Sequence, residues 1–188
     1  TVTGAVVVFH DTTKQWRIES GLRKREDRLE YVIRGSSDGF WDGQILPGRP
    51  WDDPRTPVWW SPRVRELLGY DREEFPDCLE SWMSRLHPDD RERVLAALTA
   101  HLEQHEPYDV EYRLLTKHGE YRWFRARGLA AWDDQGRPIR MAGSLQCITD
   151  RRRMEEALRR SERLLKDVID NTTAVIYVKG TDGRYMLT

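Results

Sequence analysis

The sequence predicts an α+β domain with a five-stranded antiparallel sheet, helices on one face of that sheet, and a coiled-coil-type helix at each end. Three observations support this fold class. A segment of 21 residues occurs twice, at 13–33 and at 149–169, with nine identical positions and no gap. Between the copies, strand-like segments come first, and short helices and one longer helix follow. Turn-forming residues at 117–120 and 133–137 then divide the remaining segment into three strands.

The distance of 136 positions between the two copies indicates tandem units that are joined by a repeated connector. We therefore expect the end of an earlier unit at 1–13, a connector helix at 14–34 and one complete domain at 35–150. A second connector helix is expected at 151–171, and the start of a following unit at 172–188. Function should lie in the complete domain and in the way its connectors couple it to its neighbours.

Both connectors carry a narrow apolar stripe in which spacings of four and three residues alternate. The stripe residues are Ile18, Leu22, Leu29 and Val32 in the first copy, and Met154, Leu158, Leu165 and Val168 in the second. This pattern is typical of a two-stranded coiled coil, so we expect a homodimer through the connector helices. The alternative is a lone amphipathic helix that packs on its own domain. The same stripe position is polar in both copies, Arg25 and Ser161, which predicts a coil of marginal stability.

The first half of the domain is expected to contain two strands and a short helix. The first strand runs from Asp38 to about Ile45, and the segment 46–57 is a long loop because it holds four prolines. The second strand, 58–60, ends at Ser61, which is a plausible N-cap for a helix that stops at Gly69.

The sequence His87-Pro88-Asp89-Asp90 is expected to open the longest helix of the domain, with His87 capping or bracing its start. Pro107 is expected to end this helix. A helical projection places one apolar face toward the core, with His105 on that face and His101 at its edge. The apolar residues of this face are Val94, Leu95, Leu98 and Leu102.

The composition excludes several classes of protein. The chain is 38% hydrophobic and 34% charged with a net charge of -1, and its basic residues do not gather on one face, so we expect no nucleic-acid partner. We expect no membrane helix in this fragment, because no apolar run approaches about 20 residues. The cysteines Cys78 and Cys147 lack metal-ligand spacing and predict reduced thiols in a cytoplasmic domain, although the parent protein can still carry a membrane anchor.

Several motifs, in a fixed order over residues 35–150, resemble a PAS domain of the subtype common in bacterial sensors. The motifs are Asp38-Gly39-Phe40-Trp41, Ser61-Pro62, Leu68-Gly69-Tyr70, His87-Pro88-Asp89-Asp90, Glu111-Tyr112-Arg113, His118-Gly119-Glu120-Tyr121-Arg122-Trp123 and Gly143-Ser144-Leu145-Gln146. The resemblance implies a sensory or relay module that has neighbouring PAS and output domains in the same chain. The output domain would be a histidine kinase or a cyclic-dinucleotide enzyme. The fragment itself shows no catalytic constellation and no metal site.

The resemblance also implies a pocket between the sheet and the helices, which takes a small molecule in some relatives and nothing in others. The candidate lining residues are Phe40, Trp41, Trp60, Leu68, Trp82, Leu98, His105, Tyr112, Leu114, Trp123 and Leu145. The cofactor is unknown. The alternatives are no cofactor at all in a spacer or dimerisation domain, a non-covalent flavin, or haem with His101 or His105 as its ligand. The cysteine motif of the light-sensing flavin branch is absent from the chain.

Signals in this family pass from the last strand into the helix that follows it. The candidate relay residues are Cys147, Thr149, Asp150, Leu158, Ser161 and Leu165. The family usually has Asp-Ile-Thr at this junction, where the aspartate ties the strand to the helix. This chain has Cys147 in place of that aspartate, which leaves the coupling in question.

Overall fold

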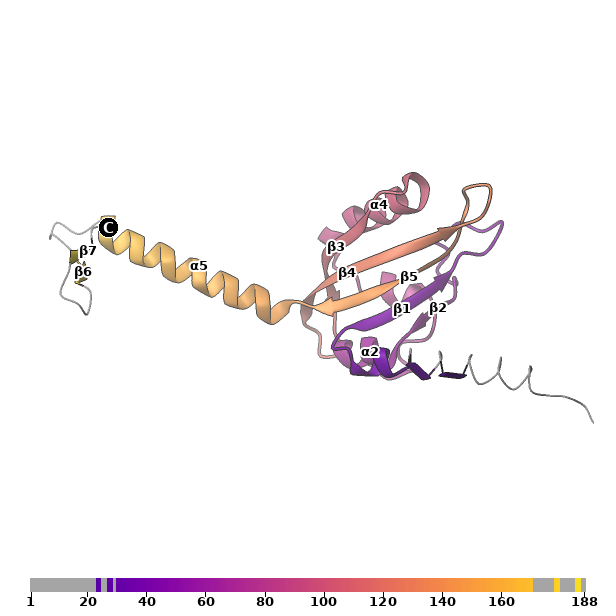
Figure 1. Ribbon diagram of the computed structural model, residues 1–188, viewed down its shortest axis with the longest axis horizontal. Coiled ribbons are helices and arrows are strands. Elements are labelled where there is room, and N and C mark those ends of the chain that lie inside the picture. Colours follow the sequence, from indigo (N-terminus) through magenta and orange to yellow (C-terminus); the bar gives the residue numbers. More distant parts are fainter. Residues whose placement is uncertain (1–22, 25–26, 29, 171–177, 180–184, 187–188) are drawn as a thin grey trace, which may run out of the picture.

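One antiparallel sheet of five strands forms the body of the computed structural model (Figure 1). The strands are β1 (Gly39–Gln44), β2 (Val58–Trp60), β3 (Tyr108–Leu115), β4 (Tyr121–Trp132) and β5 (Pro138–Cys147). Their spatial order is β2-β1-β5-β4-β3, and every neighbouring pair is antiparallel. The predicted α+β class with a five-stranded antiparallel sheet is therefore confirmed. Of the five strands of this sheet, the first and the last in the sequence, β1 and β5, are neighbours in its interior.

Three helices, α2 (Pro62–Leu68), α3 (Glu80–Met83) and α4 (Pro88–Gln104), lie between β2 and β3 in the chain. The helices α2 and α4 pack against the sheet, and Trp82 of α3 donates a hydrogen bond to Tyr112 of β3. The helix α5 (Thr149–Asp170) leaves the end of β5 and extends away from the sheet as a single rod (Figure 1). Beyond it, β6 (Val178–Lys179) pairs with β7 (Tyr185–Met186).

The structure describes residues 23–24, 27–28, 30–170, 178–179 and 185–186. The predicted end of an earlier unit at 1–13 lies outside these residues, as does most of the first connector at 14–34. Of the predicted following unit at 172–188, only the β6–β7 pair is described.

Local chemistry explains where the helices begin and end. Ser61 stands at the predicted N-cap position of α2, but its hydroxyl accepts a hydrogen bond from the backbone N–H of Phe40 at 2.9 Å, which ties α2 to β1. At the start of α4, Nδ1 of His87 accepts a hydrogen bond from the N–H of Asp89, as a capping residue does. Gly69 ends α2 with a φ of 81°, a conformation that glycine adopts without strain.

The core lies between the sheet and the helices. Its largest fully buried side chains include Phe75, Phe124 and Leu68. Complete burial of side chains of this size contributes about 1.5–3 kcal/mol each to stability. The core therefore holds the helices firmly against one face of the sheet, except where a cavity interrupts the packing.

Candidate functional site: an internal cavity and its junction with the last helix

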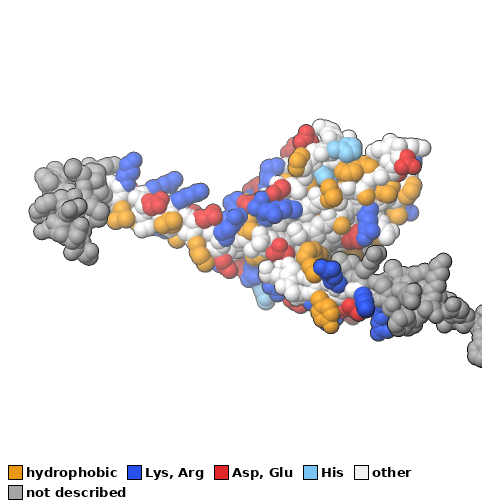
Figure 2. Space-filling model, in the orientation of Figure 1, with side chains coloured by type: hydrophobic (Ala, Val, Ile, Leu, Met, Phe, Trp, Pro, Cys, Tyr) orange, Lys and Arg blue, Asp and Glu red, His pale blue; other side chains and the backbone are white. Residues whose placement is uncertain are grey.

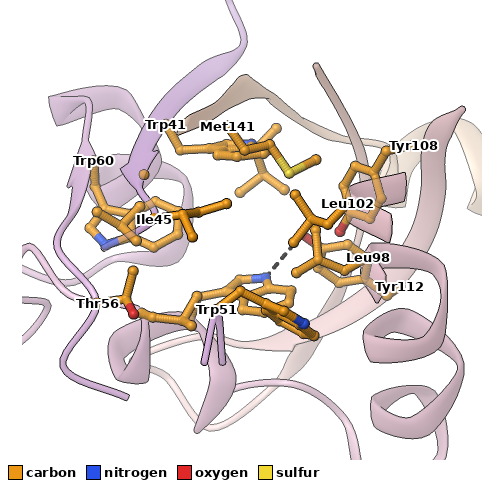
Figure 3. A pocket seen from close by; sticks show the side chains of 15 residues that line it. Trp41, Ile45, Trp51, Thr56, Trp60, Leu98, Leu102, Tyr108, Tyr112 and Met141 are labelled. Carbon is orange, nitrogen blue, oxygen red and sulfur yellow. Dashed lines mark hydrogen bonds between the residues drawn. The ribbon is translucent and has the colours of Figure 1, made fainter. Parts of the chain in front are cut away.

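An internal cavity lies between the sheet and its helices (Figure 3). Its volume is about 70 Å³. The strands β1, β2, β3 and β5 contribute to its wall, together with α4, the loop after β1 and residues at α3. The lining residues are Trp41, Gly43, Ile45, Trp51, Thr56, Val58, Trp60, Leu79, Trp82, Leu98, Leu102, Tyr108, Tyr112, Met141 and Leu145. None of these side chains is charged, so the wall is aromatic and aliphatic.

Hydrogen bonds hold several of the aromatic rings in the cavity wall. Nε1 of Trp82 donates to Oη of Tyr112 at 3.0 Å, and Nε1 of Trp60 donates to the carbonyl of Cys78 at 3.3 Å. Burial raises the pKa of Tyr112 and that of Tyr108 well above the ordinary phenol value. Both phenols therefore stay protonated at neutral pH and remain able to donate a hydrogen bond.

The structure brings six of the eleven candidate pocket residues together around the cavity. These six are Trp41, Trp60, Trp82, Leu98, Tyr112 and Leu145. Leu68 and Leu114 lie in the core without lining the cavity. Phe40 lines a shallow groove on the opposite face of the sheet, because neighbouring residues of a strand point to opposite faces. Trp123 is adjacent to the fully buried Phe124 and also lies on the opposite face.

The placement of the two histidines corrects the helical projection. His105 lies just beyond α4, with a φ of 62°, and its ring stacks on Trp132. His101 is the buried histidine, at 3% exposure. Its Nε2 accepts a hydrogen bond from the N–H of Ala130 at 3.0 Å, and its Nδ1 contacts the carbonyl of Glu106. Nε2 of His101 thus joins α4 to β4, while Nδ1 contacts the segment that follows α4.

These residues do not fit haem or flavin. No histidine or cysteine is among the residues that line the cavity, so haem would lack its usual ligands. At about 70 Å³, the cavity as observed is smaller than the roughly 150 Å³ that holds one benzene molecule, so the three fused rings of a flavin would need a large rearrangement of the wall. The described part of the chain also holds no group of three or more His, Cys, Asp or Glu that could bind a metal ion.

Sequence reasoning missed the contribution of the loop 46–57, which supplies Trp51 and Thr56 to the wall. Residues of an irregular loop carry no periodic signal, so nothing in the sequence indicated their direction. Tyr108 was missed for a different reason. It lies four positions before Tyr112 on β3 and so faces the same side, a signal that strand alternation contains.

A set of polar and aromatic contacts, which we call the α5 junction, joins the start of α5 to β3 and β4. Its residues are Glu111, Trp123, Thr149, Arg151 and Arg152. The carboxylate of Glu111 forms ion pairs with Arg151 at 2.9 Å and with Arg152. The guanidinium of Arg152 lies 3.9 Å from the ring centroid of Trp123. The hydroxyl of Thr149 accepts a hydrogen bond from the N–H of Trp123 at 2.9 Å.

The junction shows which group binds the helix in this chain, where Cys147 stands in place of the usual aspartate. The thiol of Cys147 lies 3.5 Å from the hydroxyl of Thr149 and makes no ionic tie. Asp150 does not replace the missing aspartate, because its side chain is 83% exposed and lies 3.8 Å from Arg153 on the same helix. Glu111 on β3 supplies the carboxylate that binds the helix instead.

Comparisons with known proteins agree with this architecture. A family profile described as PAS fold matches residues 57–145. The solved structure of a sensory box histidine kinase/response regulator from Burkholderia thailandensis is 42% identical in sequence, with a TM-score of 0.60. That match covers 74% of this chain and 98% of the solved chain. This chain contains a PAS domain.

Relatives of this PAS domain include sensor proteins. Sensor protein FixL of Bradyrhizobium diazoefficiens is 30% identical over 157 residues, which cover 83% of this chain and 29% of FixL. An uncharacterized protein, y4lL, of Sinorhizobium fredii is 33% identical over 141 residues, covering 74% of this chain and 17% of y4lL. The chain thus spans less than a third of each of these relatives. Its PAS domain is a sensory module of the kind that signalling proteins carry.

Within the PAS domain, Asp90 and Arg113 join the start of α4 to β3. Oδ2 of Asp90 accepts hydrogen bonds from Nε of Arg113 at 2.8 Å and from its backbone N–H at 3.0 Å. Hydrogen bonding from Arg113 lowers the pKa of the Asp90 carboxyl to about 2. The guanidinium of Arg113 also lies 5.2 Å from the ring centroid of Trp123, so this ion pair extends to the α5 junction.

We expect Asp90→Asn to reduce the free energy of unfolding by about 2 kcal/mol at pH 7. A folded-state pKa below the unfolded value stabilises the fold above pH 4 or so, and this contribution is lost as the pH falls from about 4 to about 2. Urea unfolding of both proteins at several pH values measures the difference, which should shrink on acidification. Asp89→Asn is the matched control, because its side chain is 73% exposed, and it should cost less than about 0.5 kcal/mol. Equal costs for the two substitutions would contradict a special role of Asp90.

Among the residues that the structure describes, no helix combines the length and apolar character needed to cross a bilayer.

Proposed function

We propose that this chain is the sensory and relay unit of a bacterial multidomain signalling protein. The output domain would be a histidine kinase or a cyclic-dinucleotide enzyme, and the unit would lie in the cytoplasm with the nucleotide substrates of such enzymes. The similarity to a sensory box histidine kinase/response regulator supports the kinase, at 42% identity. The helix α5 is 22 residues long and extends away from the sheet, which supports a connection to a further domain (Figure 1).

The observation that carries this proposal is the short path from the cavity to the α5 junction. Tyr112 lines the cavity, while its neighbours on β3, Glu111 and Arg113, point to the opposite face and bind α5 and Asp90. Leu145 lines the cavity on β5, and α5 begins four residues later at Thr149. A ligand or neighbouring domain that shifts β3 or β5 therefore also shifts the base of α5.

The surface of α5 supports its pairing with a second copy of this chain. The side chains of Met154, Leu158 and Leu165 are exposed and follow the predicted stripe. Figure 2 shows hydrophobic side chains along one edge of α5 and basic side chains along the other. An exposed apolar stripe of this kind is covered when two helices form a coiled coil. Ser161 interrupts the stripe and keeps the coil close to a balance between two registers, which a small shift at the junction can tip.

Glu111→Gln tests the relay, because it removes the charge that binds Arg151 and Arg152 and changes little else. We expect amide hydrogen exchange in residues 153–160 to rise about fivefold, which corresponds to about 1 kcal/mol of lost local stability. In the full-length protein, the same substitution should weaken the response of the output domain.

Asp109→Asn is the matched control for this experiment. Asp109 lies two positions away on the same strand and forms ion pairs with Arg125 and Arg127 of β4, not with α5. It should leave exchange in α5 unchanged. If the two variants alter α5 equally, or if neither does, the junction does not couple the sheet to the helix.

A further inference from the structure

The wall of the cavity discriminates against charged ligands. Its residues include four tryptophans, Trp41, Trp51, Trp60 and Trp82, and no ionised side chain. A carboxylate or phosphate that entered would lose its hydration and find no opposite charge. The rings also present both faces and edges, since Trp82 meets Tyr112 edge-on with ring centroids 6.0 Å apart. Such a wall favours a neutral ligand, and a flat aromatic ring gains most from it.

Two phenols provide the polar contact that such a ligand would use. Oη of Tyr112 accepts a hydrogen bond from Trp82, so its own hydrogen is free to be donated. Tyr108 is 5% exposed and lines the cavity, and its hydroxyl is not among the fully buried side-chain atoms that lack a partner in the described part of the chain. Because Tyr108 is part of the cavity wall, a ligand oxygen inside the cavity can form a hydrogen bond with its phenol. Figure 3 shows both tyrosines on the same side of the cavity, with Thr56 across from them.

The size of the cavity limits the ligand. At about 70 Å³, the cavity as observed is smaller than the roughly 150 Å³ that holds one benzene molecule, so even a ligand with a single ring requires part of the wall to move. Trp51 forms part of the wall but belongs to the proline-rich loop 46–57 rather than to a strand or helix. It can therefore move to admit a ligand without breaking the hydrogen bonds of the sheet.

We propose that the cavity binds a neutral compound with a single aromatic ring and one hydroxyl group, and that Tyr108 and Tyr112 bind that hydroxyl. This ligand class rests on the proposed sensory function and names the signal that the module detects. Binding would press on Tyr112, whose neighbour Glu111 holds α5.

The test uses p-cresol as the probe, with the 188-residue chain in isothermal titration calorimetry. Three related compounds separate the features of the ligand: 4-methylbenzoate carries a charge, 4-methylcyclohexanol lacks the aromatic ring, and toluene lacks the hydroxyl. We expect p-cresol to bind most tightly and 4-methylbenzoate not to bind. The proposal is overturned if 4-methylbenzoate binds as well as p-cresol, or if no probe binds at millimolar concentration.

Tyr108→Phe should weaken the binding of p-cresol about fivefold and leave the binding of toluene unchanged, because only the hydroxyl contact is lost. Tyr121→Phe is the matched control, since Tyr121 is 41% exposed and does not line the cavity. Equal losses in the two variants would overturn the assignment of Tyr108. Hydrogen exchange in α5 reports on the relay separately. A chain in which no probe binds, but in which Glu111→Gln still loosens α5, would refute this ligand class and leave the relay function intact.

Discussion

Replacement of Gly143 by alanine should destabilise the domain by about 3 kcal/mol. Gly143 lies on β5 directly opposite Gly128 of β4, and the indole of Trp41 covers this pair of glycines. A Cβ atom at position 143 would lie 2.0 Å from the carbonyl oxygen of Arg127, 2.6 Å from a ring carbon of Trp41 and 2.9 Å from Cα of Gly128. Two of these three atoms belong to the backbone, so the sheet itself would have to deform.

Gly35→Ala is the control for the effect of an added methyl group, since no atom lies within 4 Å of the Cβ position at Gly35. Urea unfolding should show a change of less than about 0.5 kcal/mol for this variant. Because Trp41 lines the cavity, Gly143→Ala should also alter the fluorescence of the cavity tryptophans in the folded protein. A cost below about 1 kcal/mol for Gly143→Ala would contradict the close contact between Trp41 and the glycine pair.

The strands and turns of the sheet could be predicted because their signals are local. The second strand is observed at Val58–Trp60 and the fourth at Tyr121–Trp132, as predicted, and the turns between the last three strands contain Gly119 and Gly136. Both glycines have a positive φ, which is the conformation these tight turns require. Residue type alone therefore indicated where the chain reverses.

The cavity was harder to predict because it depends on where elements end and how they pack. The projection that turned His105 inward assumed that the helix continues to that residue, whereas α4 ends at Gln104 and His105 turns outward in a left-handed conformation. Phe40 and Trp41 could not both face the cavity, since they are neighbours on one strand. The direction of Trp51 depends on the tertiary fold of a loop and has no sequence signal.

The α5 junction was also predictable only in its local part and not in its long-range contacts. The resemblance to PAS domains pointed to the Cys147–Thr149 segment, and the observed junction does include Thr149. Its carboxylate, Glu111, lies 40 residues from Arg151 in the sequence and meets it only because β3 lies at the edge of the sheet. Long-range ion pairs of this kind leave no periodic pattern in the sequence. The presence of Cys147 where the family usually has an aspartate therefore could not reveal which carboxylate binds the helix instead.

Replacement of Arg65 by methionine should destabilise the domain by about 3 kcal/mol. Arg65 lies on α2 with its side chain 11% exposed. Its guanidinium donates hydrogen bonds to the carbonyl of Trp60 at 2.7 Å, to the carbonyl of Phe75 at 3.1 Å and to Oδ1 of Asp77 at 2.6 Å. Methionine keeps much of the aliphatic stem but leaves two carbonyls and a carboxylate without this donor. Chemical unfolding at pH 7 measures the loss.

Arg63→Met is the matched control, because Arg63 is two residues away on the same helix and pairs with Glu66 on the surface. It should cost less than about 0.5 kcal/mol. Adding Asp77→Asn to Arg65→Met should cost less than the two single substitutions together, because the second change removes the carboxylate that the first leaves uncompensated. Additive costs would show that Arg65 and Asp77 act independently.

The substitution Arg65→Met should also affect the cavity, because Arg65 contacts Trp60, which lines it. Its carbonyl binds Arg65, its N–H donates to Asp77 at 3.1 Å, and its indole lines the cavity. The Arg65–Asp77 pair therefore holds one wall of the cavity from behind. Arg65→Met should weaken p-cresol binding more than Arg63→Met does, even under conditions in which both variants are fully folded. If binding is equal in the two variants, the wall at Trp60 is held by its edge-on packing against Phe75, whose ring centroid lies 5.4 Å away, and not by the ion pair.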